Sequence, residues 1–161
     1  MGVFTHSVTA AVDPTVVWEH WTDVEHWVVD DPAITRARLN GPVAKGATGV
    51  VRRNGRRVSF RLALVDRQKV RFALESRFPM MLLRLDYALE RPEERLDEGA
   101  DGAEVGADAD REVDPALRVL THTVTTRGPL AKVWDRLLIK KFAADQPAVM
   151  ANIIAAAAVE G

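Results

Sequence analysis

The feature that most constrains this chain is a stripe of apolar residues near its C-terminal end. Between residues 130 and 157, large apolar side chains recur at intervals of three and four, the period of an amphipathic α-helix. Burying about ten such side chains stabilises a fold by on the order of 20 kcal/mol as an upper estimate. The helix therefore needs a large apolar partner surface, and Pro147 within it predicts a kink. The stripe comprises Leu130, Val133, Trp134, Leu137, Leu138, Phe142, Val149, Met150, Ile153, Ile154 and Ala157.

Three consecutive segments supply that partner, because each alternates apolar and polar residues as a half-buried antiparallel strand does. They span residues 56–65, 69–78 and 81–90. Asn54-Gly55, just before the first of them, is a strong signal for a tight hairpin turn. The predicted inward faces comprise Val58, Phe60, Leu62 and Leu64, then Val70, Phe72, Leu74 and Phe78, then Met81, Leu83, Leu85, Tyr87 and Leu89.

The remaining elements complete a seven-stranded sheet. Residues 3–11, 33–40, 47–53 and 117–127 are predicted as strands, although the alternation in the last one does not define its inward face. Asp13-Pro14 and Thr22-Asp23 are typical of helix N-termini, since Asp caps a helix and Pro suits its first position. Two short helices are therefore expected between the first and second strands.

Composition is that of an ordinary globular protein of one domain spanning residues 1–161, with a net charge of -1 and no Cys. Disulfides, zinc–thiolate sites and Cys nucleophiles are excluded. Residues 91–114 stand apart, with ten acidic and three basic residues, and are predicted to form a solvated, mobile hairpin loop. No metal-site spacing and no cofactor motif is present: Asp108, Asp110 and Asp114 lack the spacing of a calcium-binding loop, and His20 and His26 are expected on exposed helix faces.

The distribution of charge and the length of the longest uncharged stretch indicate which kinds of partner to expect. Arg52, Arg53, Arg56 and Arg57 form a basic hairpin tip, but no stacking aromatic residues accompany them, so nucleic-acid binding is not expected. The uncharged stretch 146–159 is too short to span a membrane, and a signal peptide is not recognised, so a soluble, cytoplasmic protein is expected. Because hairpin turns alternate between the two ends of a sheet, the basic tip and the acidic loop should lie at opposite ends. Weak, salt-sensitive head-to-tail self-association is a hypothesis that follows.

Four sequence segments in this order resemble the START-related SRPBCC superfamily, in particular its polyketide cyclase/dehydrase-like branch. They are DPTVVWEHWTDVEHW at 13–27, LNGPVAKGATG at 39–49, THTVTTRGPLAKVWDRLL at 121–138 and FAADQPAVMANIIAAAA at 142–158. The resemblance implies an α+β helix-grip fold, in which a curved seven-stranded antiparallel sheet wraps around a long C-terminal helix. It also implies an apolar cavity between the two. The chain departs from many relatives at Asp30, where they carry a second Trp, which predicts a more open or more polar cavity mouth.

Three functions remain open at this point. The first is binding of a small hydrophobic or aromatic ligand, such as a lipid, quinone or polyketide-like molecule, in the cavity. The second is a cyclase, dehydratase or aromatase that uses His122 as acid or base together with Tyr87, because a neutral imidazole titrates near neutral pH. The third is a protein-interaction module with a filled core. A core His satisfied by one hydrogen bond is the alternative interpretation of His122, and a packing role is the alternative for Tyr87.

The candidate ligand-binding residues are mostly apolar and lie on the predicted inward faces. A cavity gains affinity from desolvating apolar surface, and a few polar groups orient the ligand. The candidates are Trp27, Phe60, Phe72, Leu85, Tyr87, His122, Trp134 and Leu138.

Overall fold

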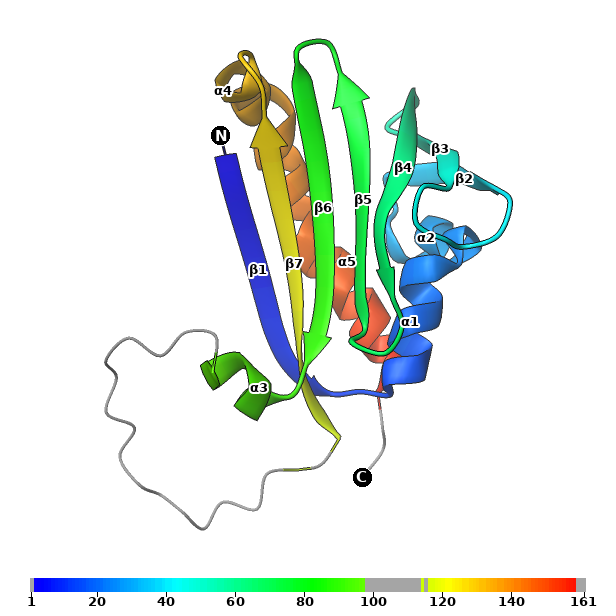
Figure 1. The fold of residues 1–161 in the computed structure, drawn as a ribbon, viewed down its shortest axis with the longest axis vertical. Helices are drawn as coiled ribbons and strands as arrows, with labels where there is room; N and C mark the ends of the chain where they lie inside the picture. Colours follow the sequence, from blue (N-terminus) through cyan, green and yellow to red (C-terminus); the bar gives the residue numbers. More distant parts are fainter. Residues whose placement is uncertain (1, 98–113, 115, 159–161) are drawn as a thin grey trace.

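A computed structural model describes residues 2–97, 114 and 116–158 (Figure 1). Long antiparallel strands form one layer, and the C-terminal helix crosses their inner face. The strands are β1 (Gly2–Ala11), β2 (Ile34–Asn40), β3 (Thr48–Arg53), β4 (Arg56–Asp66), β5 (Arg71–Phe78), β6 (Met81–Glu90) and β7 (Leu117–Arg127). The helices are α1 (Pro14–Thr22), α2 (Val24–Asp30), α3 (Pro92–Asp97), α4 (Ala131–Trp134), the π-helical turn η1 (Asp135–Ile139) and α5 (Lys140–Ala157).

The sheet has the strand order β1-β7-β6-β5-β4-β3-β2, and every neighbouring pair is antiparallel. Its hairpin turns alternate between the two ends, so the 54–55 and 79–80 turns lie at the end where α4 begins (Figure 1). Asn54 and Gly55 both have positive φ, 49° and 76°, as a type I′ turn requires. The predicted seven-stranded antiparallel sheet is thereby confirmed.

The two short helices begin at the predicted residues. Asp13 caps α1, with its carboxylate accepting from the Thr15 N–H, and Pro14 occupies the first helical position. Asp23 caps α2 in the same way through the Glu25 N–H. Each cap satisfies a backbone donor that the first helical turn leaves free. Of the two helices, α2 packs against the edge strand β2, and α1 packs against α2 and α5 (Figure 1).

Two strand faces differ from the sequence expectation or complete it. A register shift in β4 between Leu62 and Leu64 places Val65, rather than Leu64, against the core, so the predicted inward position of Leu64 is wrong. A β-bulge of this kind reverses the alternation beyond it. In β7, the buried alternate residues are Leu120, His122, Val124 and Thr126, which settles the inward face that the sequence left undefined.

The C-terminal helical region is continuous but not uniform. Where the periodicity predicts one α-helix with its irregularity at Pro147, the π-helical turn η1 separates α4 from α5. Pro147 itself lies within α5. A π-helical turn inserts extra residues into the helix and changes which side chains face the sheet, and such turns are frequent at functional sites.

The segment 91–114 is only partly described. Its first residues form α3, which the prediction of a loop from residue 91 missed. The rest of the predicted mobile loop, including Asp108 and Asp110, lies outside the described residues. Residue 91 follows β6 at the end of the sheet opposite the 54–55 turn, as predicted. The proposed salt-sensitive self-association stays a prediction.

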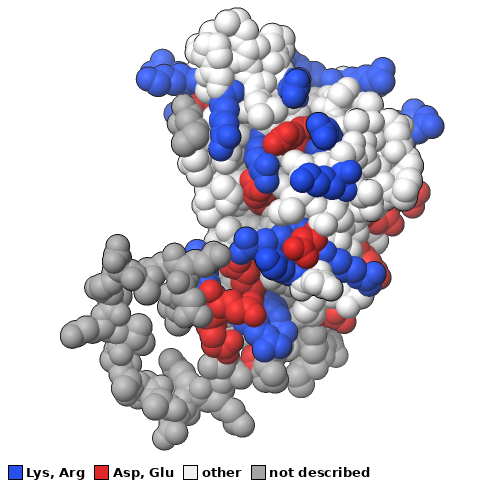
Figure 2. Space-filling view, in the orientation of Figure 1, with Lys and Arg blue, Asp and Glu red and all other residues white. Residues whose placement is uncertain are grey.

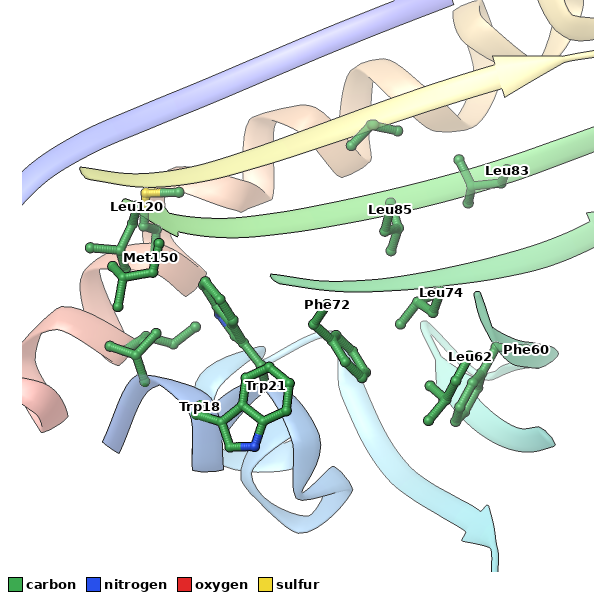
Figure 3. Close-up of a cluster of buried hydrophobic side chains, with 14 of the residues drawn as sticks. Trp18, Trp21, Phe60, Leu62, Phe72, Leu74, Leu83, Leu85, Leu120 and Met150 are labelled. Carbon is green, nitrogen blue, oxygen red and sulfur yellow. The ribbon is translucent and has the colours of Figure 1, made fainter. Parts of the chain in front are cut away.

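The core lies between the inner sheet face and the helices (Figure 3). Phe72, Leu62 and Leu120 from the sheet are almost fully buried, as is Met150 from α5. The outer sheet face carries interspersed positive and negative side chains (Figure 2). Among them the Arg84 guanidinium contacts Glu75 at 3.2 Å and Asp86 at 3.0 Å. The sheet therefore has one apolar and one charged face.

Candidate functional site

A cavity of about 670 Å³ lies between the inner sheet face and the helical segment η1–α5. Six of the predicted ligand-binding residues line it, namely Trp27, Phe60, Phe72, Leu85, Tyr87 and Trp134. The Trp27 ring packs on Phe60 with centroids 5.2 Å apart, and its indole N–H donates to the Trp21 carbonyl. Of the other two predicted residues, His122 does not line this cavity, and the side chain of Leu138 lies outside what the structure describes. The interior is thus unfilled and largely aromatic and aliphatic.

The cavity opens at one end of the sheet. Its exposed lining residues are Asn54, Arg56 and Arg57 at the β3–β4 turn, and Leu137 and Lys141 on the helical segment. All other lining residues are buried or half-buried. The mouth therefore lies between this hairpin and the start of α5, and a ligand would enter between them.

An ion-paired arginine joins three segments at the mouth. Arg53, at the end of β3, contacts the Asp31 carboxylate at 2.6 Å and the Asp145 carboxylate of α5 at 2.9 Å. Its guanidinium also lies 4.3 Å from the centre of the Phe142 ring. The Asp31 side chain is only 7% exposed, so its charge depends on this partner. Arg53 flanks the Asn54-Gly55 turn as predicted, but its two ion pairs were not foreseen from the sequence.

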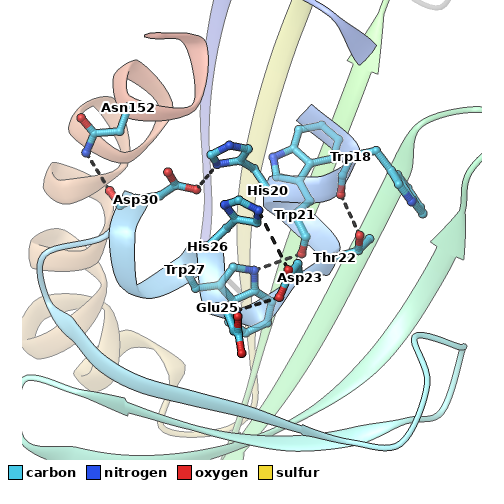
Figure 4. Close-up of polar contacts among 10 residues, drawn as sticks. All are labelled: Trp18, His20, Trp21, Thr22, Asp23, Glu25, His26, Trp27, Asp30 and Asn152. Atoms are coloured by element: carbon cyan, nitrogen blue, oxygen red, sulfur yellow. Dashed lines mark hydrogen bonds and ion pairs between the residues drawn. The ribbon is translucent and has the colours of Figure 1, made fainter. Parts of the chain in front are cut away.

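A buried histidine–carboxylate pair lies in the wall of the cavity. His20 of α1 is 8% exposed, and its Nδ1 lies 2.7 Å from Oδ2 of Asp30, the last residue of α2 (Figure 4). The Asn152 side chain of α5 donates to the Asp30 backbone carbonyl at 2.8 Å. The expectation that His20 is on an exposed helix face is wrong, because α2 folds back over this side of α1. The half-buried His26 packs on His20, and the centroids of the two rings are 4.1 Å apart.

Tyr87 and His122 lie next to each other on β6 and β7. They are paired in the strand register, and their ring centroids are 4.5 Å apart in an edge-to-face arrangement. Tyr87 lines the cavity, and burial raises the pKa of its hydroxyl well above the usual range, which the nearby Arg53 charge partly offsets. Tyr87 is thus a neutral hydroxyl at physiological pH.

His122 is placed differently from the expectation. It does not line the cavity but a second, smaller hollow of about 350 Å³, next to His6 and Gln146. Its Nδ1–H donates to the Gln146 Oε1 at 2.8 Å, and its buried Nε2 has no partner among the described residues. Burial lowers the pKa of His122 to about 4, although the Gln146 hydrogen bond acts in the opposite direction. The imidazole is therefore neutral at pH 7.

Polar side chains that were not predicted at the cavity are His20, Asp31, Asp145 and Gln146, and all four line it together with Asp30. Each acts through a partner on another element, so no local spacing could have identified it. Only Asp30 carried a signal, as the residue that departs from the related sequences. Within the described part of the chain, no group of three or more His, Asp or Glu side chains could hold a metal ion. No described helix is long and apolar enough to cross a membrane.

Solved structures with the same architecture confirm the predicted helix-grip fold. Norcoclaurine synthase from Thalictrum flavum matches with a TM-score of 0.62 at 11% identity, over 95% of this chain and 83% of that chain. Major latex-like protein 151 from Panax ginseng matches with a TM-score of 0.66 at 12% identity, over 96% of this chain and 95% of that chain. The di-domain ARO/CYC BexL of the BE-7585A biosynthetic pathway matches with a TM-score of 0.66 at 12% identity, over 95% of this chain and 46% of that chain.

These neighbours belong to the SRPBCC superfamily, which includes polyketide cyclases. At such low identity the likeness shows the fold alone. No protein-family model matches the sequence, and no curated protein does.

Proposed function

We propose that this protein binds a small hydrophobic or aromatic ligand in the cavity between the sheet and α5. The observation that carries the proposal is the cavity itself, about 670 Å³ of space with an aromatic wall and one mouth. Protein interiors are normally packed without such voids, and concave apolar sites of this size are typical of small-molecule sites. The side chains that line an apolar cavity lack van der Waals contacts on that side, and a bound ligand would supply them.

The fold neighbours support this function class. The norcoclaurine synthase structure is a complex with dopamine and hydroxybenzaldehyde, two small aromatic molecules. An aromatic ligand fits the wall of this chain, where Trp27, Phe60 and Phe72 supply ring faces and edges. Offset and edge-to-face ring contacts add to the free energy of apolar burial. The third possibility, an interaction module with a filled core, requires a packed interior that this chain lacks.

A cyclase or dehydratase that uses His122 and Tyr87 is the second candidate. Two observations favour it: Tyr87 lines the cavity, and the His122 Nε2 beside it is unpartnered among the described residues. However, His122 lines the smaller hollow, so its contact with a ligand would pass through Tyr87 or Gln146. Binding is therefore the better-supported function.

Filling the cavity tests the proposal. Leu74 and Leu85 are cross-strand partners that both line the cavity, so Leu74→Trp/Leu85→Trp places two indoles where the ligand would lie. We expect the wild type to bind the neutral fluorophore 1-aminoanthracene, and the double variant to bind it at least tenfold more weakly. Fluorescence titration measures both affinities. Because overpacking costs about 1–3 kcal/mol, circular dichroism must first show that the variant is folded.

Leu82→Trp is the matched control, since Leu82 lies on the same strand as Leu85 but does not line the cavity. It adds an indole without occupying the interior, so we expect an unchanged affinity. Wild-type protein that fails to bind the fluorophore, or equal affinities in the cavity-filled variant and the control, would contradict the proposed site.

A further inference from the structure

The geometry points to His20 as the polar recognition group of the cavity, through Nε2, for an aromatic ligand with a weakly acidic hydroxyl such as a phenol. This inference rests on the proposed function and specifies the ligand class. An imidazole and a carboxylate buried together lose much of their hydration, so a buried ionisable pair in a cavity wall is a candidate functional group.

Hydrogen bonding fixes which nitrogen is available. The Asp30 carboxylate lies 2.7 Å from Nδ1 of His20 and accepts its proton-bearing N–H. In the neutral imidazole the lone pair is then on Nε2, which can accept a hydrogen bond. No described residue donates a hydrogen bond to the His20 Nε2. Fully buried polar side-chain atoms without a partner are found at Trp21 and His122, and the His20 Nε2 is not one of them. Because His20 lines the cavity, a ligand hydroxyl can reach the ring there.

Asp30 is a positioning residue for this interaction. Its carboxylate orients the ring and raises the acceptor strength of Nε2, as carboxylate partners of histidine ligands do. The Asn152 bond to the Asp30 backbone holds the end of α2 against α5. The acceptor is thus held in place by residues of three helices, α1, α2 and α5.

The surroundings define the rest of the ligand. Trp21 and Trp27 line the cavity on the same helices as the His20–Asp30 pair, and Phe60 and Phe72 line it from β4 and β5. Aromatic walls favour a flat, apolar body. A strong hydrogen-bond acceptor favours an acidic donor, because a hydrogen bond becomes stronger as its donor or acceptor carries more charge. A phenolic hydroxyl on a fused or substituted aromatic ring combines both properties.

A pair of probes that differ only at the hydroxyl tests the inference. Competition against 1-aminoanthracene gives the affinities of 2-naphthol and 2-methoxynaphthalene, which lacks the O–H donor. We expect the wild type to prefer 2-naphthol about tenfold, the size of one well-made hydrogen bond. In His20→Asn the amide N–H can still donate to Asp30, but Nε2 is gone. The preference should fall to near onefold.

His26→Asn is the matched control, because His26 packs on His20 but does not line the cavity, and it should keep the tenfold preference. If His20→Asn loses both probes through misfolding, Asp30→Asn serves instead. It retains an acceptor for Nδ1 without the charge, and the preference should fall about threefold. Equal wild-type affinity for the two probes, or a preference that survives in His20→Asn, would overturn the inference and leave the cavity intact. Failure of the wild type to bind either probe would count against the proposed function itself.

Discussion

Arg53→Gln is expected to lower the free energy of unfolding by about 3 kcal/mol. The guanidinium is the charged partner of two carboxylates, and the Asp31 side chain is nearly inaccessible to water. Removing one member of a buried ion pair leaves the other charge without compensation, which costs more than the pair contributed. The change also removes the ion pair that joins β3 to α5 at the cavity mouth. Urea unfolding followed by Trp fluorescence measures the difference.

Arg52→Gln is the control for this prediction. Arg52 is the preceding residue of the same strand, it is exposed, and its side chain forms no ion pair among the described residues. The same loss of charge should therefore change stability by no more than about 0.5 kcal/mol. Equal losses in the two variants would mean that Arg53 contributes no more to stability than an ordinary surface charge.

Acid should destabilise the protein through His122. Burial holds its pKa at about 4 in the folded state, whereas an unfolded His has a pKa of about 6.5. The unfolded chain therefore takes up the proton first. The stabilisation from the neutral buried ring is complete above pH 6.5 and is lost as the pH falls towards 4. The difference corresponds to on the order of 3 kcal/mol.

A variant comparison isolates this contribution from the other titrating groups. Between pH 7 and pH 4, the stability difference between the wild type and His122→Gln should change by about 3 kcal/mol in favour of the variant. His6→Gln serves as the control, because half-buried His6 lies opposite His122 on β1, and it should keep most of the wild-type acid sensitivity. Parallel pH profiles for wild type and His122→Gln would show that His122 is not buried as described.

The cavity walls could be predicted from the sequence because strand alternation has a fixed period. Phe60, Phe72, Leu85 and Tyr87 lie on the inward face that this period assigns them. The alternation failed at Leu64, because a bulge is set by the pairing with β5 rather than by the strand's own residues. The cavity itself could not be predicted from periodicity, because a pattern of apolar residues does not define the space left between them.

The polar groups of the site could not be predicted for a related reason. The charge of Arg53 is neutralised by Asp145, which lies 92 residues further along the chain. His20 becomes buried only when α2 folds back and brings Asp30 to its ring. Local spacing is informative about faces of one element, whereas these contacts depend on how separate elements pack.

The most direct test of the central claim is where a bound probe lies. Intermolecular nuclear Overhauser effects between 1-aminoanthracene and the labelled protein report which side chains lie beside its rings. The account predicts contacts to Phe72 and Leu85, which are buried beneath α5. Contacts confined to exposed side chains that do not line the cavity, such as Val29 and Val133, with none to the interior, would contradict it.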